Sequence, residues 1–185
     1  MSTTIVPLAP GLWPDFEDLF GKQGACYGCW CTHFRLATAA RRESSRERNK
    51  DHIKARIEAG PPPGLLALED GKAVGWMQIG PRADVPEWNN KGRGSAPIDP
   101  ADASDPAVWA ISCFFIRAKA RGRGITHRLV EGGIDFARSN GARSSRPARS
   151  TCRAIRARSA FSSARRVCSR RPGSRGWWNA RRVGR

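Results

Sequence analysis

The residues best suited to chemistry lie between an apolar run and a helical pattern, at Ala120–Leu129. Gly122 and Gly124 let the main chain approach an anion closely. The first amides of a following helix have no partner within that helix, and they present the positive end of its dipole to the anion. The basic side chains of this segment can add charge-assisted contacts: Arg121, Arg123 and Arg128. The pattern therefore predicts a phosphate-binding turn.

Two regular elements position this turn. Residues 108–117 are rich in β-branched and aromatic side chains and predict a central strand. From Ile125 to Ser139 apolar residues recur near a 3.6-residue period, which predicts a helix that ends at Asn140 and Gly141. Strand, glycine turn, basic residues and helix in this order favour a phosphate site over a plain structural turn.

At Lys119–Gly124 the chain resembles the GNAT superfamily of coenzyme-A-dependent N-acetyltransferases. The family signature is a basic or amide residue, two residues, Gly, one residue, then Gly or Ala, and Lys119 stands where Gln or Arg is usual. The resemblance implies acetyl-CoA as co-substrate, with no metal. It also implies an α/β (α+β) fold with a mixed, mostly antiparallel central sheet flanked by helices. The implied cofactor-binding residues are Arg121, Gly122, Arg123, Gly124, Ile125 and Thr126 for the pyrophosphate, and the main chain of Phe114, Phe115 and Ile116 for the pantetheine arm.

The upstream sequence agrees with that family order. Residues 65–79 predict a β-hairpin whose Asp70-Gly71 turn supplies the positive φ angles that tight turns need. Residues 13–20 predict a short helix, and Ser45–Glu58 predicts a longer one with Ile53 and Ile57 on one face. Residues 81–106 are polar and proline-bearing, which indicates a mobile surface loop near the acceptor entrance.

Charge divides the chain into two parts. The whole chain has 33 Lys and Arg against 16 Asp and Glu, a net charge of +17. Residues 143–185 hold 14 Arg and no Lys, Asp or Glu, which leaves 19 basic and 16 acidic side chains in the first 142 residues. We therefore predict one GNAT-like domain over 1–142 and an aberrant, disordered Arg/Ser-rich tail over 143–185. No 18-residue apolar run or signal segment is present, so a soluble cytoplasmic protein is expected.

The tail has the composition of GC-rich coding sequence translated in a wrong frame. A codon built from the third base of one codon and the first two of the next is constrained by the protein sequence alone. From Arg143 to Cys152 that frame permits VVEA, one unresolved residue and PVDV; from Ser169 to Ala180 it permits EAAGFERVVER. Both strings are similar to the fifth strand and following helix of GNAT proteins. We therefore hypothesise a frameshift near Ala142 that leaves the C-terminal strands and helix missing or disrupted.

The catalytic residues stay unassigned. The resemblance implies that a general base assists attack of the amine on the thioester, and that a Tyr often protonates the leaving thiolate. That Tyr normally lies in the replaced segment, and the only Tyr here is Tyr27. The predicted strand carries Ser112 and Cys113 at its middle rather than a carboxylate. We expect the protein to act mainly by holding the thioester and the amine in attack geometry. The expected acceptor is a small-molecule or peptide amine, and a homodimer is a further expected partner.

A second group able to do chemistry is Cys26, Cys29 and Cys31, with His33 two residues on. Thiolates and imidazole bind zinc. Structural zinc sites, however, usually draw ligand pairs from two separated knuckles, and no second Cys-x-x-Cys follows. The favoured interpretation is a buried, partly aromatic segment lining the acceptor pocket, in which reduced Cys packs as a small hydrophobe.

The alternative function is nucleic-acid binding through the tail, whose arginines can contact phosphates while Trp177 and Trp178 stack on bases. RNA-binding tails usually mix Lys, Gly and recurring Arg motifs, and this tail shows no repeat. We therefore favour transfer of an acetyl group from acetyl-CoA to an amine, impaired in this chain by loss of the fifth strand. No specific nucleic-acid partner and no membrane partner are expected.

The frameshift hypothesis makes a direct prediction. Sequencing across codons 138–146 should reveal an insertion or deletion relative to the frame that encodes the GNAT-like strings. A chain translated in the restored frame should bind acetyl-CoA more tightly than this chain, because it regains the fifth strand, which the resemblance implies forms one wall of the coenzyme site. Isothermal calorimetry measures both affinities, and equal values would contradict the prediction.

Overall fold

The computed structural model describes residues 2–143. Its strands form one sheet in the order β1-β2-β3-β4, with every neighbouring pair antiparallel. The strands are β1 (Thr3–Pro7), β2 (Gly64–Glu69), β3 (Lys72–Pro81) and β4 (Trp109–Ile116). The helices are α1 (Trp13–Phe20), α2 (Thr38–Arg42), α3 (Arg46–Ala59) and α4 (Ile125–Ser139). Short 3-10 helices lie at Pro10–Leu12, Arg82–Asp84, Pro86–Asn89, Pro100–Ala103 and Ala118–Ala120.

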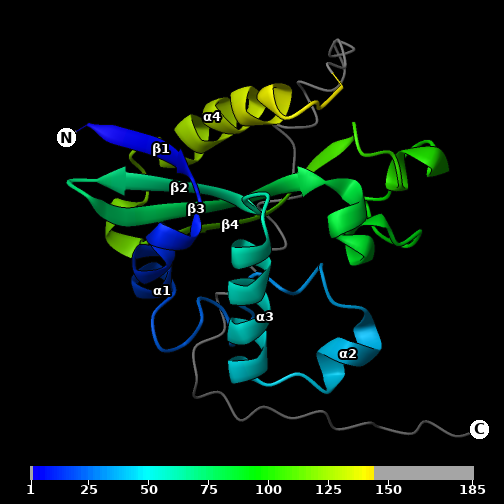
Figure 1. Ribbon diagram of the computed structural model, residues 1–185, viewed down its shortest axis with the longest axis horizontal. Helices are drawn as coiled ribbons and strands as arrows, with labels where there is room; N and C mark the ends of the chain where they lie inside the picture. Colours follow the sequence, from blue (N-terminus) through cyan, green and yellow to red (C-terminus); the bar gives the residue numbers. More distant parts are fainter. Residues whose placement is uncertain (1, 144–185) are drawn as a thin grey trace, which may run out of the picture.

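The sheet lies between two helical layers. In Figure 1, α4 covers one face, while α1 and α3 lie on the other. This arrangement confirms the expected α+β class, an antiparallel sheet flanked by helices. The segment expected to carry the disrupted C-terminal strands and helix, and the tail itself, lie outside the described residues from position 144 onward.

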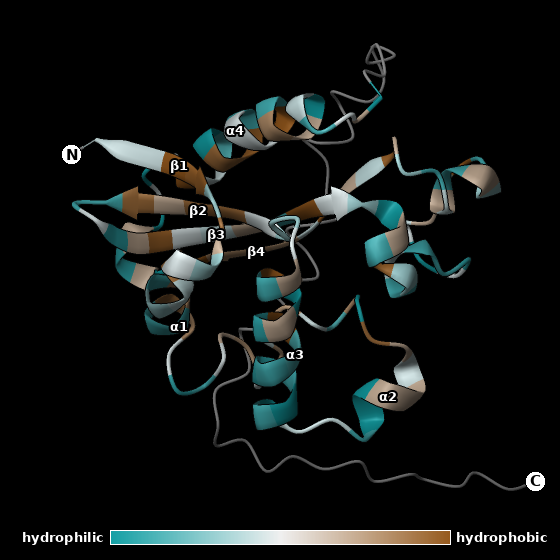
Figure 2. Ribbon diagram, in the orientation of Figure 1, coloured by the Kyte–Doolittle hydropathy of each residue, from teal (hydrophilic) through white to brown (hydrophobic). Residues whose placement is uncertain are grey.

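The two middle strands supply both halves of the core. Because neighbouring residues of a strand point to opposite faces, Leu66 and Trp76 pack on the side of α1 and α3. Leu65 and Met77 pack on the side of α4. Figure 2 shows β2 as largely hydrophobic along its length, as expected for a strand covered on both faces.

The third helix is mostly polar and is held by a narrow apolar contact. It begins after Ser45, whose Oγ accepts a hydrogen bond from the Arg48 amide at 3.2 Å, so Ser45 is the N-cap. Ile53 and Ile57, one turn apart, are buried against the sheet. The rest of α3 is largely hydrophilic in Figure 2. The predicted helix over Ser45–Glu58 is confirmed with a shift of one residue.

Most predicted elements are confirmed. The helices predicted over 13–20 and 125–139 are α1 and α4, and the strand predicted over 108–117 is β4. The hairpin turn has φ of 49° at Asp70 and 75° at Gly71, as the sequence predicted. The structure adds β1 and α2, which the sequence pattern did not reveal.

The segment 81–106 differs from a featureless loop. It contains three short 3-10 helices, and Val85 and Glu87 within it are buried. The Glu87 carboxylate accepts hydrogen bonds from the amide and the hydroxyl of Thr38, at 3.2 and 3.1 Å. These contacts tie the segment to the start of α2. In the described part of the chain, no helix combines the length and the apolar character needed to cross a bilayer.

The packing of α4 predicts that shortening a side chain on its buried face lowers the free energy of unfolding far more than shortening one on its exposed face. Leu129 is fully buried between α4 and the sheet, so Leu129→Ala should lower the free energy of unfolding by about 2–5 kcal/mol. Ile134, on the same helix, is 41% exposed, and Ile134→Ala should change it by about 0.5 kcal/mol or less. Urea denaturation followed by circular dichroism measures both. Similar losses in the two variants would show that α4 does not pack as described.

Candidate functional site

The corner between β4 and α4 is built from a 3-10 turn and two glycines. After Ala118–Ala120 the chain turns outward, and residues 121–124 are exposed. Gly122 and Gly124 adopt φ of 78° and 76°. This left-handed conformation is one that glycine adopts without steric cost. The next residue, Ile125, is 2% exposed and anchors the start of α4 in the core.

Several amides of this corner have no acceptor among the residues that the structure describes. Within residues 2–143, the backbone N–H groups of Gly122, Gly124, Ile125 and Thr126 make no hydrogen bond. The N-cap of α4, Gly124, has no side chain to cap the first turn. Because α4 is 15 residues long, its dipole adds a positive potential at this end. The corner therefore offers a set of donors to an anion.

The arginines of the corner have partners of their own. Arg121 Nε donates to the carbonyl oxygen of Ile116 at 3.1 Å. Arg123 forms an ion pair of 2.9 Å with Glu69 at the end of β2. Glu69 also accepts from the hydroxyl of Thr3 at 3.1 Å. The corner is thus fastened to the β2–β3 hairpin, a role for Glu69 that the sequence did not suggest.

The fourth strand is irregular at its middle. Gln78 on β3 lies opposite Cys113, while the next residue, Ile79, lies opposite Ile111. Ser112 is therefore an extra residue, a β-bulge in β4. Ser112 and Gln78 are buried, and their side-chain polar atoms have no hydrogen-bond partner within the described residues. Gln78 is a polar residue among the apolar residues of β3, and this contrast is the sequence signal that could have singled it out.

The outer edge of β4 is open in the part of the chain that the structure describes. Only β3 pairs with β4 among residues 2–143. Phe114, Phe115 and Ile116 lie on this edge strand, directly before the corner. Alternate main-chain groups of an edge strand point away from its partner and can pair with an added extended segment. The residues expected to bind the pantetheine arm and those expected to bind the pyrophosphate thus form one continuous path.

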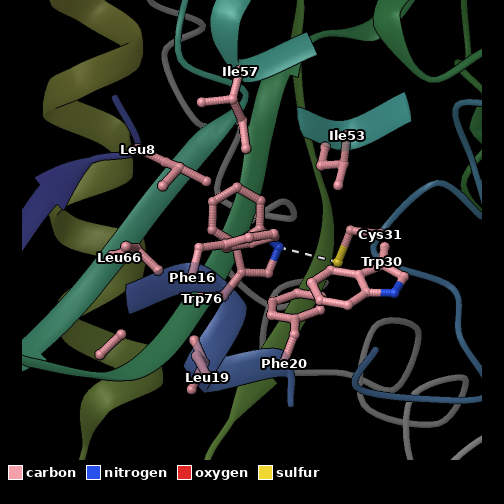
Figure 3. Packing of buried hydrophobic residues seen from close by; sticks show 11 residues of the cluster. Leu8, Phe16, Leu19, Phe20, Trp30, Cys31, Ile53, Ile57, Leu66 and Trp76 are labelled. Atoms are coloured by element: carbon pink, nitrogen blue, oxygen red, sulfur yellow. Dashed lines mark hydrogen bonds between the residues drawn. The ribbon is translucent and has the colours of Figure 1, made fainter. Parts of the chain in front are cut away.

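Three cysteine side chains, from the cysteine segment and from β4, lie on the side of the sheet that α1 and α3 cover. The Sγ atoms of Cys31 and Cys113 lie 3.1 Å apart, although the residues are 82 positions apart in the chain. The indole N–H of Trp76 donates to Cys31 Sγ at 3.1 Å, as Figure 3 shows. A hydrogen bond from Cys31 lowers the pKa of Cys29 from 9.0 to about 6. Burial raises the pKa of Cys31 itself.

The remaining candidates of the cysteine segment lie apart from this cluster. The His33 ring packs edge-on against Phe34 at 4.7 Å, and partial loss of water around the ring, with the nearby charges of Arg41 and Arg93, lowers its pKa. Tyr27, the one tyrosine of the sequence, is 70% exposed. Among residues 2–143, no three or more His, Cys, Asp and Glu side chains are arranged to hold a metal ion. Trp30 and Cys31 are buried, as expected for a packed aromatic segment.

Comparison with known proteins places these features in context. The sequence pattern described as "Acetyltransferase (GNAT) family" matches residues 30–151. No curated protein matches the chain significantly. Three solved structures are similar to this chain at low identity. The ribosomal-protein-alanine N-acetyltransferase from Brucella melitensis biovar Abortus 2308 has 13% identity and a TM-score of 0.46 over 86% of this chain and 94% of its own. An N-acetyltransferase from Staphylococcus aureus Mu50 has 14% identity and a TM-score of 0.45, over 84% and 82%. AAC(6')-Iy, solved with the bisubstrate analogue CoA-S-monomethyl-acetylneamine, has 13% identity and a TM-score of 0.44. The alignment covers 99% of this chain and 100% of AAC(6')-Iy.

The thiol cluster gives a pH-dependent prediction. Because the pKa of Cys29 is lowered to about 6, its thiolate is present at pH 7 and disappears as the pH falls through 6. Alkylation of Cys29 by iodoacetamide should be half-maximal near pH 6. In Cys31→Ala the hydrogen bond is lost, and the rate at pH 7 should fall by about 10-fold or more. Mass spectrometry of the Cys29 peptide measures the rate; a midpoint above pH 8 in the unaltered chain would refute the assignment.

Proposed function

Because the chain belongs to the GNAT family of acetyltransferases, we propose that it transfers an acetyl group from acetyl-CoA to a small-molecule or peptide amine. The coenzyme would bind along the outer edge of β4 and at the corner that follows. One observation carries the proposal. The exposed glycine corner at the start of α4 presents N–H groups that have no partner within the described residues.

The corner suits a diphosphate through its main chain. Gly122, Gly124, Ile125 and Thr126 offer N–H groups, and the helix dipole favours negative charge at this place. The guanidinium of Arg123 is held by Glu69, so we assign it to fastening the corner rather than to the phosphates. The main chain therefore provides the principal ligands, a binding mode that depends little on side-chain identity.

The edge of β4 suits an extended amide-bearing arm. Phe114–Ile116 can pair with such an arm as a sheet pairs with an added strand. At the far end, Arg121 Nε donates to the Ile116 carbonyl, which lies directly before the corner. We expect Arg121 to leave this carbonyl when the arm binds, and to swing toward the phosphates.

The chemistry asked of the chain is mainly positioning. When bound, acetyl-CoA supplies an activated thioester. The strand amides near the bulge at Ser112 can polarise the thioester carbonyl, and the sheet holds it in place for the amine. No carboxylate lies on β4, so no general base is assigned from this strand.

The proposal includes an impaired activity for this chain. Within the described residues β4 has no neighbour on its outer side, where the family resemblance places a fifth strand and one wall of the coenzyme slot. The competing proposal, nucleic-acid binding, rests on the arginines of the tail beyond residue 143, outside the described residues. The two functions therefore use different parts of the chain and can be separated by a single substitution.

A negative charge at the corner tests the acetyltransferase proposal. Gly124→Asp places a carboxylate beside the expected pyrophosphate, and the site has open space for the side chain. Asp is a good N-cap and tolerates a left-handed backbone better than most residues, so the fold should persist. Affinity for CoA should fall by about 10-fold, equivalent to about 1.4 kcal/mol, as measured by calorimetry.

Gly141→Asp is the matched control. Gly141 also has positive φ, 84°, and open space, but it follows the other end of α4. This variant should bind CoA as the unaltered chain does. Binding of polynucleotide should be the same in both variants. Equal CoA affinity in the two variants would place the coenzyme elsewhere.

A further inference from the structure

Two segments far apart in the sequence bring thiols to one point. Cys29 and Cys31 belong to the cysteine loop, residues 21–37, and Cys113 belongs to β4. The Sγ atoms of Cys31 and Cys113 are separated by 3.1 Å, in van der Waals contact or closer. Cys31 is 3% exposed, whereas Cys29 and Cys113 are partly exposed. The acetyl-transfer chemistry proposed above uses none of these thiols.

The cysteine loop holds Cys31 in a fixed place. Several non-glycine residues of the loop adopt left-handed backbone conformations, which persist only where the surroundings impose them. These residues are Ala25, Tyr27, Trp30 and Cys31, with φ of 64°, 53°, 42° and 59°. Two contacts hold the loop against α1: the Trp30 ring stacks on Phe20 at 5.5 Å, and the Ala25 amide donates to the Phe20 carbonyl oxygen at 2.8 Å. Figure 3 shows Trp30 and Phe20 side by side, with Cys31 facing Trp76.

We propose that Cys31 and Cys113 are an oxidation site, at which a hydroperoxide converts the two thiols into a disulfide, with Cys29 as the entry point. Bond formation requires the two sulphurs to approach by about 1 Å. Cys29 can meet the oxidant because its side chain is partly exposed. Cys31 links the other two, since its Sγ lies 3.1 Å from that of Cys113 and it follows Cys29 by two residues in the cysteine loop.

The reaction balances in three steps. The Cys29 thiolate attacks the hydroperoxide, an S–O bond forms, the O–O bond breaks, and an alcohol or water leaves. Cys31 then attacks the sulphur of the Cys29 sulfenic acid, and water leaves as the S–O bond breaks. Finally Cys113 attacks the sulphur of Cys31 and releases Cys29 as a thiolate. In sum, two thiols and one hydroperoxide give one disulfide, one alcohol and one water.

The lowered pKa of Cys29 agrees with its place as the first thiol, because the thiolate is the nucleophile. Burial raises the pKa of Cys31, so Cys31 is a thiol when Cys29 meets the oxidant, and its proton leaves with the hydroxyl of the sulfenic acid as water. The final disulfide would join the cysteine loop to β4 across 82 positions of sequence. Closing so long a loop restricts the unfolded chain, and the oxidised protein should be the more stable form.

The experiment uses the full chain, reduced and then treated with an equimolar amount of hydrogen peroxide. After alkylation and tryptic digestion, mass spectrometry should find the peptide of Cys31 joined to that of Cys113, two hydrogens lighter than the separate peptides. Fragment ions must separate Cys31 from Cys26 and Cys29, because all three lie in one tryptic peptide. The midpoint of thermal unfolding should rise by about 10 °C and return on reduction with dithiothreitol.

Three variants locate the chemistry. Cys113→Ala and Cys31→Ala should lose both the linked peptide and the rise in midpoint. Cys29→Ala should form the same link about 10-fold more slowly at pH 7, because the entry thiol is missing and the oxidant must react with Cys113, which is partly exposed, or with the buried Cys31. The mapping of the unaltered chain needs no variant to fold. The proposal falls if Cys113 stays open to alkylation after oxidation, or if Cys29 joined to Cys31 is the final product.

Discussion

The pairing of β3 with β4 decides where every candidate group lies. Antiparallel pairing fixes which residues face each side of a sheet, and one extra residue changes the order. The extra residue is Ser112, so Ile111 and Phe114 both lie on the α4 side, while Cys113 lies on the side of the cysteine loop. Without the bulge, Cys113 and the corner could not both keep their present places, because every residue on one side of it would change face.

The corner depends on α4, and α4 depends on β3. The helix buries Ile125, Leu129 and Ala137 against β2 and β3. Gly133 of the helix lets Met77 of β3 approach closely. This packing fixes the first turn of the helix and thereby aims its amides outward. An unpaired N–H group costs about 1–3 kcal/mol when buried. Here residues 121–124 are exposed, so water can reach the amides of the corner until an anion replaces it.

Local patterns in the sequence predicted the helices and the hairpin. They missed the features that depend on contacts between residues far apart in the sequence. The boundaries of α1 and α4 followed from apolar spacing and from Asn140. The strand β1, Thr3–Pro7, was missed because it is short, ends in proline and becomes a strand by pairing with β2. The bulge at Ser112 and the contact between Cys31 and Cys113 leave no local signature. Both arise from tertiary pairing, which the sequence pattern alone does not encode.

One strand carries both proposed chemistries, each on different groups of the strand. A coenzyme arm would use main-chain groups in the plane of the sheet, at the outer edge of β4. The Cys113 side chain stands perpendicular to that plane, on the side of the cysteine loop. A bond from Cys31 to Cys113 would therefore leave the edge open. It would act instead on the bulge, one residue away, where the strand is least regular and where the thioester carbonyl would lie. Oxidation would then alter acetyl transfer through the position of the strand, and coenzyme binding at the corner would be largely retained.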